Sequence, residues 1–182
     1  MTSKKEISVL KNHYKKYQLN VDGETLIVGS KLYENSYDRR HWYANVTGID
    51  FQAGEGVDVV HDIQHYIVIN GGVKMFDHID CCSVLEHVEN PWRAALNLQR
   101  VLKKGGTILL SVPFVWRVHG YPDDYWRFTK SGIKSIFDEI DWVSLGYFGF
   151  DGKKIDRAAS FRDENNVPWL ARTEIVGVGI KK

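Results

Sequence analysis

The stretch FDHIDCCSVLEHVENPWRAALNLQRVLKKGGTILLSVP, residues 76–113, decides the fold. It opens with an apolar run, 76–83, that predicts a strand. Asn90 and Pro91 then mark the start of a helix, and Lys103-Lys104 before Gly105-Gly106 mark its end. A near-continuous apolar run, 107–112, predicts a second strand that is buried on both faces. Strand, helix and strand in this order predict one β-α-β unit with parallel strands.

The remaining segments continue this alternation of strands and helices. Apolar spacing predicts a leading helix over 4–18, and a second helix follows its cap at Thr129. Further strands are expected at 25–28, 46–49, 57–60, 141–150 and 173–180, with a charged loop between the last two. Because no helix pattern separates those last two strands, they predict an antiparallel pair. The sequence therefore predicts a doubly wound, Rossmann-like α/β fold, a seven-stranded sheet with an antiparallel C-terminal strand at its edge.

Composition predicts one globular domain that spans residues 1–182. Apolar residues make up 43% of the chain and charged residues 26%, which is ordinary for a globular protein. The 24 basic and 23 acidic residues give a net charge of +1, so no global field attracts nucleic acid. Cys81 and Cys82 are adjacent in a strand and point to opposite faces, so we expect reduced core thiols. With no signal-peptide core and no membrane-length apolar run, we expect a soluble, cytoplasmic protein without membrane contact.

Two residues at strand ends indicate a nucleotide-type cofactor. Gly29 follows the first strand, and Asp50 closes the second strand 21 residues later. In nucleotide-binding α/β folds, an acidic residue about twenty positions after the first glycine accepts hydrogen bonds from ribose hydroxyls. We interpret Asp50 as such a ligand, and the alternative is an aspartate that only caps a turn.

The segment HGYPDDYWRFT, residues 119–129, lies beyond the strand at 107–112, at the edge where open α/β sheets bind their ligands. His119 titrates near neutrality, Asp124 can orient it, and Arg127 can hold a carboxylate or phosphate. These three residues are the catalytic candidates. The aromatic residues nearby either wall a substrate pocket or fold the loop onto the sheet, and they are Trp116, Tyr121, Tyr125 and Trp126.

Metal ligands are not indicated by residue spacing. The chain has seven histidines, but none sits in a compact spacing with cysteine or carboxylate partners. Adjacent Glu86 and His87 could serve as acid and base, but they are interpreted mainly as a turn that forms the cleft. No metal is therefore expected.

Three motifs carry a family resemblance. SVLEHV at 83–88, RVLKKGG at 100–106 and VPF at 112–114 followed by 119–129 resemble the second half of a class I S-adenosylmethionine (SAM)-dependent methyltransferase, of the type 11-like kind. The resemblance spans Thr25 to Ile140 and implies SAM as the cofactor. It implies cofactor contacts at Gly29, Ser30, Asp50, Phe51, Asp62, Ile63, Ser83 and Val84.

The first loop departs from the family's pattern. Such enzymes usually carry an acidic residue and three spaced glycines there, whereas this chain has Ile27, Gly29, Lys31 and Tyr33 at those positions. Two functions therefore stay open, methyl transfer to a small-molecule or glycan-like acceptor and a catalytically silent binding or partner protein. A nucleic-acid methyltransferase is disfavoured by the neutral charge, and a nicotinamide enzyme by the missing G-x-G-x-x-G. Neither the acceptor atom nor the oligomeric state follows from the sequence.

Overall fold

The computed structural model describes residues 4–19, 22–34, 36–65, 73–120, 123–149, 154 and 172–182. The strands are β1 (Glu24–Val28), β2 (Asn45–Asp50), β3 (Val59–Val60), β4 (Phe76–Cys82), β5 (Leu102–Pro113), β6 (Ile140–Gly149) and β7 (Arg172–Lys181). The helices are α1 (Lys4–Lys16), α2 (Pro91–Val101) and α3 (Lys130–Ile136), with single 3-10 turns η1 (Arg40–Trp42) and η2 (Leu85–His87). None of these helices is long and apolar enough to cross a membrane.

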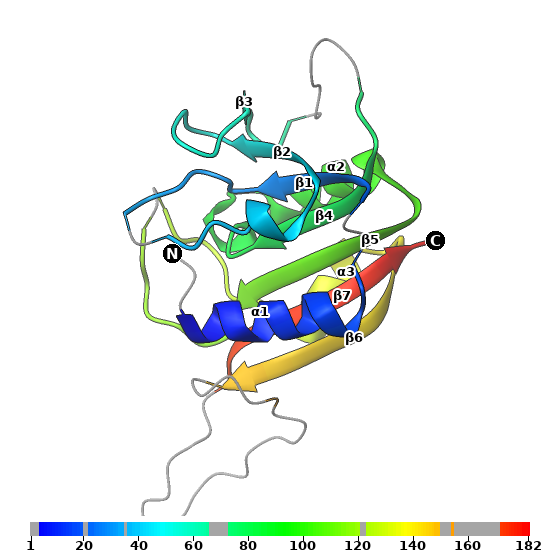
Figure 1. Ribbon diagram of the computed structural model, residues 1–182. Helices are drawn as coiled ribbons and strands as arrows, with labels where there is room; N and C mark the ends of the chain where they lie inside the picture. Colours follow the sequence, from blue (N-terminus) through cyan, green and yellow to red (C-terminus); the bar gives the residue numbers. More distant parts are fainter. Residues whose placement is uncertain are drawn as a thin grey trace, which may run out of the picture.

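One seven-stranded sheet has the order β3-β2-β1-β4-β5-β7-β6 (Figure 1). Strands β1 to β5 pair in parallel, and β7 runs antiparallel to both of its neighbours. The predicted fold class is confirmed. The expected position of the antiparallel strand is wrong, because β7 lies inside the sheet and β6 forms the edge. Burial explains this order: residues 175–179 are all buried and need neighbours on both sides, whereas β6 exposes Asp141 and Val143.

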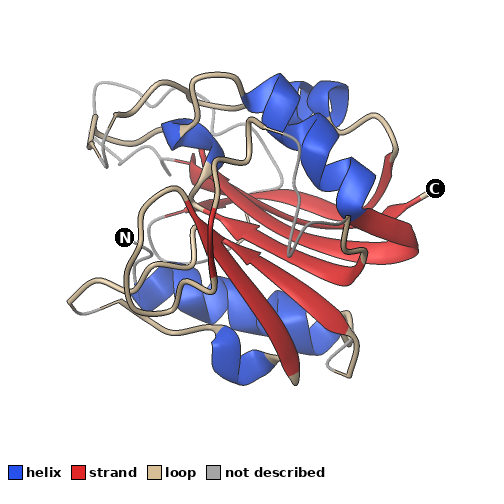
Figure 2. Ribbon diagram, turned by 90° about the horizontal axis from the view of Figure 1, so that it is seen from above, coloured by secondary structure: helices blue, strands red, loops and turns tan. Residues whose placement is uncertain are grey.

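Helices cover both faces of the sheet (Figure 2). Leu10 of α1 packs with Ile27 and Leu109 on one face, and Leu98 of α2 packs with Leu26 and Ile79 on the other. The two adjacent cysteines divide between these layers, with Cys81 in the α2 layer and Cys82 in the α1 layer. Both thiols are free and buried, as the alternation of side chains in a strand predicts.

The two predicted helix caps are confirmed. Asn90 Oδ1 accepts a hydrogen bond of 3.0 Å from the Arg93 amide, and Thr129 Oγ1 accepts one of 3.0 Å from the Gly132 amide. The predicted end of α2 is three residues too late, because buried Leu102 already pairs with Phe76 as part of β5.

The helix after Thr129 is shorter than its apolar spacing indicates. It ends at Ile136, and Ile140 starts β6. The charged loop predicted between β6 and β7 lies almost wholly outside the described residues, and so does Tyr121.

Candidate active site

The connection between β1 and β2 has only the short turn η1 among its described residues, and a buried ion pair attaches it to the sheet. Arg39 Nε donates a hydrogen bond of 2.9 Å to Asp80 Oδ2 in the middle of β4. Tyr43 Oη donates to the same oxygen at 3.1 Å. Asp80 is fully buried, so its charge needs this compensation. The ion pair therefore holds the loop that carries Gly29 against the sheet.

A cavity of about 290 Å³ opens at the carboxyl ends of β1, β2 and β4. Its lining includes every residue to which the sequence resemblance assigned a cofactor contact. These residues are Gly29, Ser30, Asp50, Phe51, Asp62, Ile63, Ser83 and Val84. Parallel strands end at the same edge of a sheet, which explains why residues from the four loops after β1, β2, β3 and β4 meet here.

Gly29 lies where two loops approach each other closely. Its φ of +66° is in the left-handed region, and a Cβ at this position would lie 2.6 Å from Val84 Cγ2. Ser83 has a φ of +55°, which is unusual for a residue with a side chain and occurs often at functional sites. Ser30 Oγ is buried and has no hydrogen-bond partner within the described part of the chain. The floor of the cavity thus combines a close backbone approach with a hydroxyl that can bind a ligand.

Asp50 both caps a turn and faces the cavity. Its Oδ2 accepts from the Lys31 amide at 3.1 Å, and its Oδ1 accepts from the Gln52 amide at 3.0 Å. A carboxylate oxygen has a second lone pair, so the two oxygens can still accept from a vicinal diol. The two interpretations of Asp50 from the sequence are therefore compatible.

Asp62 has a similar arrangement at the end of β3. Its Oδ1 accepts a hydrogen bond of 2.9 Å from the Gln64 amide, and the His65 Nδ1 lies 3.7 Å from its Oδ2. Ile63 next to it is buried and contributes an apolar wall.

The three catalytic candidates contact one another. Asp124 Oδ2 lies 3.0 Å from His119 Nδ1 and also accepts from the His119 amide at 2.8 Å. Arg127 binds both carboxylate oxygens of Asp124, at 2.5 and 2.7 Å, and these hydrogen bonds hold the pKa of Asp124 well below its usual range. Arg127 also donates to the carbonyls of Trp116 and Arg117, so its guanidinium fastens the loop internally.

This cluster lies behind the cavity and does not line it. Two imidazoles line the cavity, those of His61 and of His87 in η2, and the His87 ring packs edge-on against His119 with the centroids 4.9 Å apart. His87 Nδ1 lies 2.6 Å from the Asp123 carbonyl oxygen, and burial lowers the pKa of His87. From the sequence, an acid-base role of His87 was only the minor alternative, because SVLEHV predicts a turn without showing which side chain enters the cavity.

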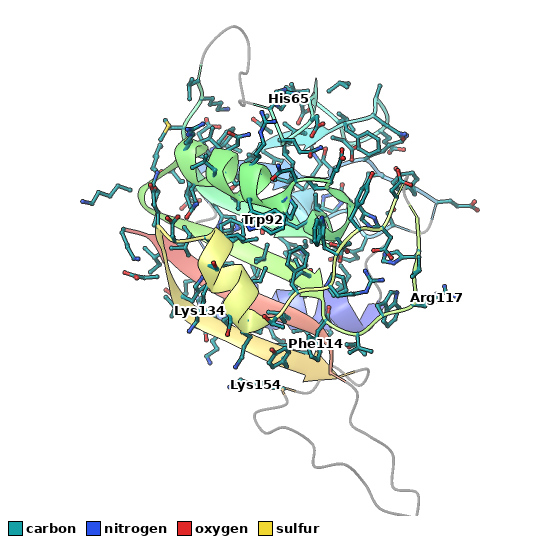
Figure 3. The ribbon with its side chains drawn as sticks, turned by 180° about the vertical axis from the view of Figure 1, so that it is seen from behind. His65, Trp92, Phe114, Arg117, Lys134 and Lys154 are labelled. Atoms are coloured by element: carbon teal, nitrogen blue, oxygen red, sulfur yellow. The ribbon has the colours of Figure 1, made fainter. Side chains whose placement is uncertain are left out.

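Backbone contacts dock the 119–129 segment onto η2. The Tyr125 amide donates to the Glu86 carbonyl at 2.7 Å, and Trp126 Nε1 donates to the Val88 carbonyl at 2.9 Å. The Trp126 ring packs edge-on against Trp92 of α2, which is labelled in Figure 3 together with Phe114 and Arg117 of the chain leaving β5. Tyr125 lines the cavity, whereas Trp126 fastens the loop.

Comparisons with known proteins agree with this geometry. A family model described as "Methyltransferase domain" matches residues 28–110, which include all eight cavity residues assigned above. Over these residues the chain resembles the SAM-dependent methyltransferases, and its fold is theirs as well. The protein is thus a methyltransferase enzyme with SAM as its cofactor. This favours catalysis over the alternative of a catalytically silent binding or partner protein. The catalytic candidates of the 119–129 segment lie outside the matched residues.

Solved structures share the fold of this methyltransferase at low sequence identity. A SAM-dependent methyltransferase from Clostridium acetobutylicum has 11% identity and a TM-score of 0.63, over 98% of this chain and 91% of that one. The PH0226 protein from Pyrococcus horikoshii has 13% identity and a TM-score of 0.65, over 97% and 89%. The N-methyltransferase NodS from Bradyrhizobium japonicum, in complex with S-adenosylhomocysteine (SAH), has 12% identity and a TM-score of 0.61, over 98% of this chain and 88% of that one. No curated protein sequence matches the chain.

The cavity residues of the methyltransferase fit SAM chemically. Asp50 offers acceptors for the ribose diol, Gly29 leaves room beside Val84, and the Ser30 hydroxyl is available for a new hydrogen bond. Ile63 offers an apolar surface for the adenine. The first loop therefore fits a cofactor site chemically, although Lys31 and Tyr33 stand where the family usually has glycines.

Proposed function

We propose that this methyltransferase moves the methyl group of SAM to a nucleophilic atom of a small-molecule or glycan-like acceptor in the cytoplasm. The observation that carries the proposal is the cavity, which joins the cofactor residues at the ends of β1, β2 and β4 to His87 and Tyr125 on its other side. A site of this kind can hold donor and acceptor next to each other. Alignment alone supplies much of the rate of an in-line displacement.

On the cofactor side, we propose that the chain binds and orients. Asp50 holds the ribose hydroxyls, and Asp62 accepts from the adenine amine. The bare Cα of Gly29 lets the cofactor approach the backbone, since any side chain there would meet Val84. Bound SAM supplies an electrophilic methyl group on a sulfonium.

On the acceptor side, two imidazoles are candidates for removing a proton. His119 is the proposed base, with Asp124 and Arg127 as positioning residues, because the Asp124 carboxylate lies 3.0 Å from its ring and can stabilise a positive charge on it. His87 is a second candidate, because it lines the cavity. Its Nδ1–H faces the Asp123 carbonyl, which leaves Nε2 with a free lone pair in the neutral ring.

A small acceptor is favoured over a polyanion by the balanced charge. The chain has 24 basic and 23 acidic residues, so no net positive field attracts nucleic acid. The aromatic ring of Tyr125 at the cavity is suited to the face of a sugar or a flat small molecule.

Calorimetry followed by methyl transfer tests this proposal. The purified chain is titrated with SAM and SAH, and is then incubated with methyl-labelled SAM and a panel of saccharides, small hydroxylated and aminated compounds, transfer RNA and unfolded protein. We expect both cofactor forms to bind and label to enter the small-molecule set. Absence of binding would contradict the cofactor site, and label found only in RNA or protein would contradict the acceptor class.

A further inference from the structure

Glu86, His87 and His119 form a cluster of metal-ligand type on the acceptor side of the cavity. One carboxylate oxygen of Glu86 and one ring nitrogen of each histidine all lie within 4.8 Å of one another. Glu86 Oε1 is 3.8 Å from His87 Nε2. Glu86 and His87 come from η2, whereas His119 comes from the loop that follows β5. The cluster therefore exists only in the folded chain, which is why residue spacing indicated no metal.

Both imidazoles are oriented as metal-binding histidines usually are. A metal-ligating histidine almost always gives its second ring N–H to a carboxylate or a backbone carbonyl, and this contact fixes its tautomer. His87 Nδ1 lies 2.6 Å from the Asp123 carbonyl oxygen. His119 Nδ1 lies 3.0 Å from Asp124 Oδ2 and 3.3 Å from the Arg117 carbonyl oxygen. In the neutral rings these contacts place the proton on Nδ1, so Nε2 of each histidine can donate a lone pair.

The third group supplies negative charge in a buried position. Glu86 is only 2% exposed, and a buried carboxylate is stable only where positive charge or hydrogen bonds compensate it. The Arg127 guanidinium interacts electrostatically with Glu86, and a divalent cation between the three groups would bring further positive charge to this carboxylate.

We propose that Glu86, His87 and His119 bind a divalent transition-metal cation of the Zn²⁺ class. Two imidazole nitrogens and one carboxylate oxygen are the ligand set of many catalytic zinc sites, which keep a further position open. Imidazole ligands favour Zn²⁺ and its transition-metal neighbours over Mg²⁺, which prefers oxygen ligands. Metal bonds of about 2.0–2.2 Å bring the ligand atoms of a tetrahedral site to roughly 3.3 Å from one another, so binding draws the three side chains together.

Of the three ligands His87 lines the cavity, so a cation bound to it would lie next to that cavity. An acceptor hydroxyl bound there has a lowered pKa, because the cation stabilises the alkoxide. In the metal-bound enzyme His119 is a ligand and does not act as base, so the proton of the acceptor hydroxyl passes to solvent water while the cation stabilises the alkoxide. This role rests on the proposed methyl transfer, whereas the metal site itself does not.

Calorimetric titration of the metal-free protein tests the site. The purification tag is removed and the chain is dialysed against EDTA and then against metal-free buffer, before titration with ZnCl₂, CoCl₂, MnCl₂ and MgCl₂. We expect one Zn²⁺ per chain, and a Co²⁺ complex with the visible absorption of a four- or five-coordinate site. Glu86→Gln and His119→Ala should each weaken Zn²⁺ binding by a hundredfold or more. His41→Ala should bind as the wild type, because His41 is a surface histidine near Asp38.

Two further measurements keep the result decisive. His119 lies on a partly exposed loop, so its variant reports on the site even if Glu86→Gln fails to fold. SAH titration of the same samples shows whether each variant is folded, and its failure in the wild type would contradict the cofactor site without touching the metal site. Stoichiometric Zn²⁺ binding lost in the His119 variant supports the proposal. Wild-type protein that binds none of the transition metals, or binds them equally well after both substitutions, would overturn it.

Discussion

Asp80 in the centre of β4 accepts a hydrogen bond of 2.9 Å from Arg39, which lies in the loop between β1 and β2. Both side chains are buried. Burial by itself would raise the pKa of Asp80, but the Arg39 guanidinium holds that pKa below its usual value. The pair thus attaches to the sheet the loop that carries Gly29 and Ser30, two of the proposed cofactor residues.

Arg39→Ala should therefore destabilise the protein strongly. It leaves the Asp80 charge buried without its guanidinium, a loss that costs about 3–5 kcal/mol of unfolding free energy. Arg40→Ala is the matched control, because Arg40 pairs with Asp58 at 2.9 Å in a partly exposed position where the loss is about 1 kcal/mol or less. Urea unfolding of the three proteins measures the difference. Equal losses in the two variants would show that burial of the pair is unimportant.

Gly29→Ala should close the cofactor site. Gly29 and Gly105 both have positive φ, +66° and +75°, so alanine at either position costs about 1–2 kcal/mol of backbone strain. Only at Gly29 does the added Cβ meet another atom, Val84 Cγ2 at 2.6 Å, whereas nothing lies within 4 Å at Gly105. We expect SAH affinity to fall at least tenfold in Gly29→Ala and to stay unchanged in Gly105→Ala. Adding Val84→Ala to the first variant should restore part of the affinity, and a Gly29→Ala protein with wild-type affinity would refute the close approach.

Asp50→Ala should weaken SAM and SAH binding by a factor of about ten or more, because it removes charge-assisted hydrogen bonds worth roughly 1.5–3 kcal/mol. Asp58→Ala is the matched control. Its carboxylate also accepts a backbone amide, that of Gly48 at 2.6 Å, but it does not line the cavity. Calorimetry on both variants shows whether Asp50 binds the ligand itself or only stabilises the loop through its hydrogen bonds to backbone amides. Equal affinities in the two variants would remove Asp50 from the site.

His119→Ala and Arg127→Ala should separate cofactor binding from transfer. Neither residue lines the cavity, so SAM affinity should stay within about threefold, while methyl transfer falls a hundredfold or more, the usual scale for a positioned acid-base group. Arg117→Ala is the control, since the Arg117 side chain is exposed. Thermal unfolding shows which variants remain folded. If the folded variants transfer methyl groups at the wild-type rate, the segment 119–129 has a structural role only.

Stability should fall in mild acid because of His78. Burial lowers the pKa of this β4 residue from 6.5 to about 4, against the opposing effect of nearby Asp80. The unfolded chain therefore takes up the proton first, so the stability is complete above about pH 6.5 and declines as the pH falls toward 4. Protonation of His78 should lower the free energy of unfolding by roughly 2–3 kcal/mol between pH 7.5 and pH 4.5. His78→Gln should remove this part of the pH dependence in urea unfolding, whereas His41→Gln, a change at an exposed histidine, should keep it.

The amino-acid sequence by itself determined the secondary structure and the cofactor edge. Asn90 and Thr129 are caps whose hydrogen bonds reach only three residues along the chain, so a local pattern is enough to predict them. Gly29 and Asp50 could be placed together because parallel strands end at one edge of a sheet, whatever their packing. The acceptor atom, in contrast, has no local signature in the sequence.

Tertiary structure decided the features that depend on partners distant in the sequence. The strand β7 lies inside the sheet because its buried run needs two neighbours, and Arg39 enters the core because Asp80 is buried there. His87 and His119 meet only when the loop after β5 folds back over η2. Burial and hydrogen bonding depend on distances in space, and periodicity along the chain carries no information about those distances for residues that far apart.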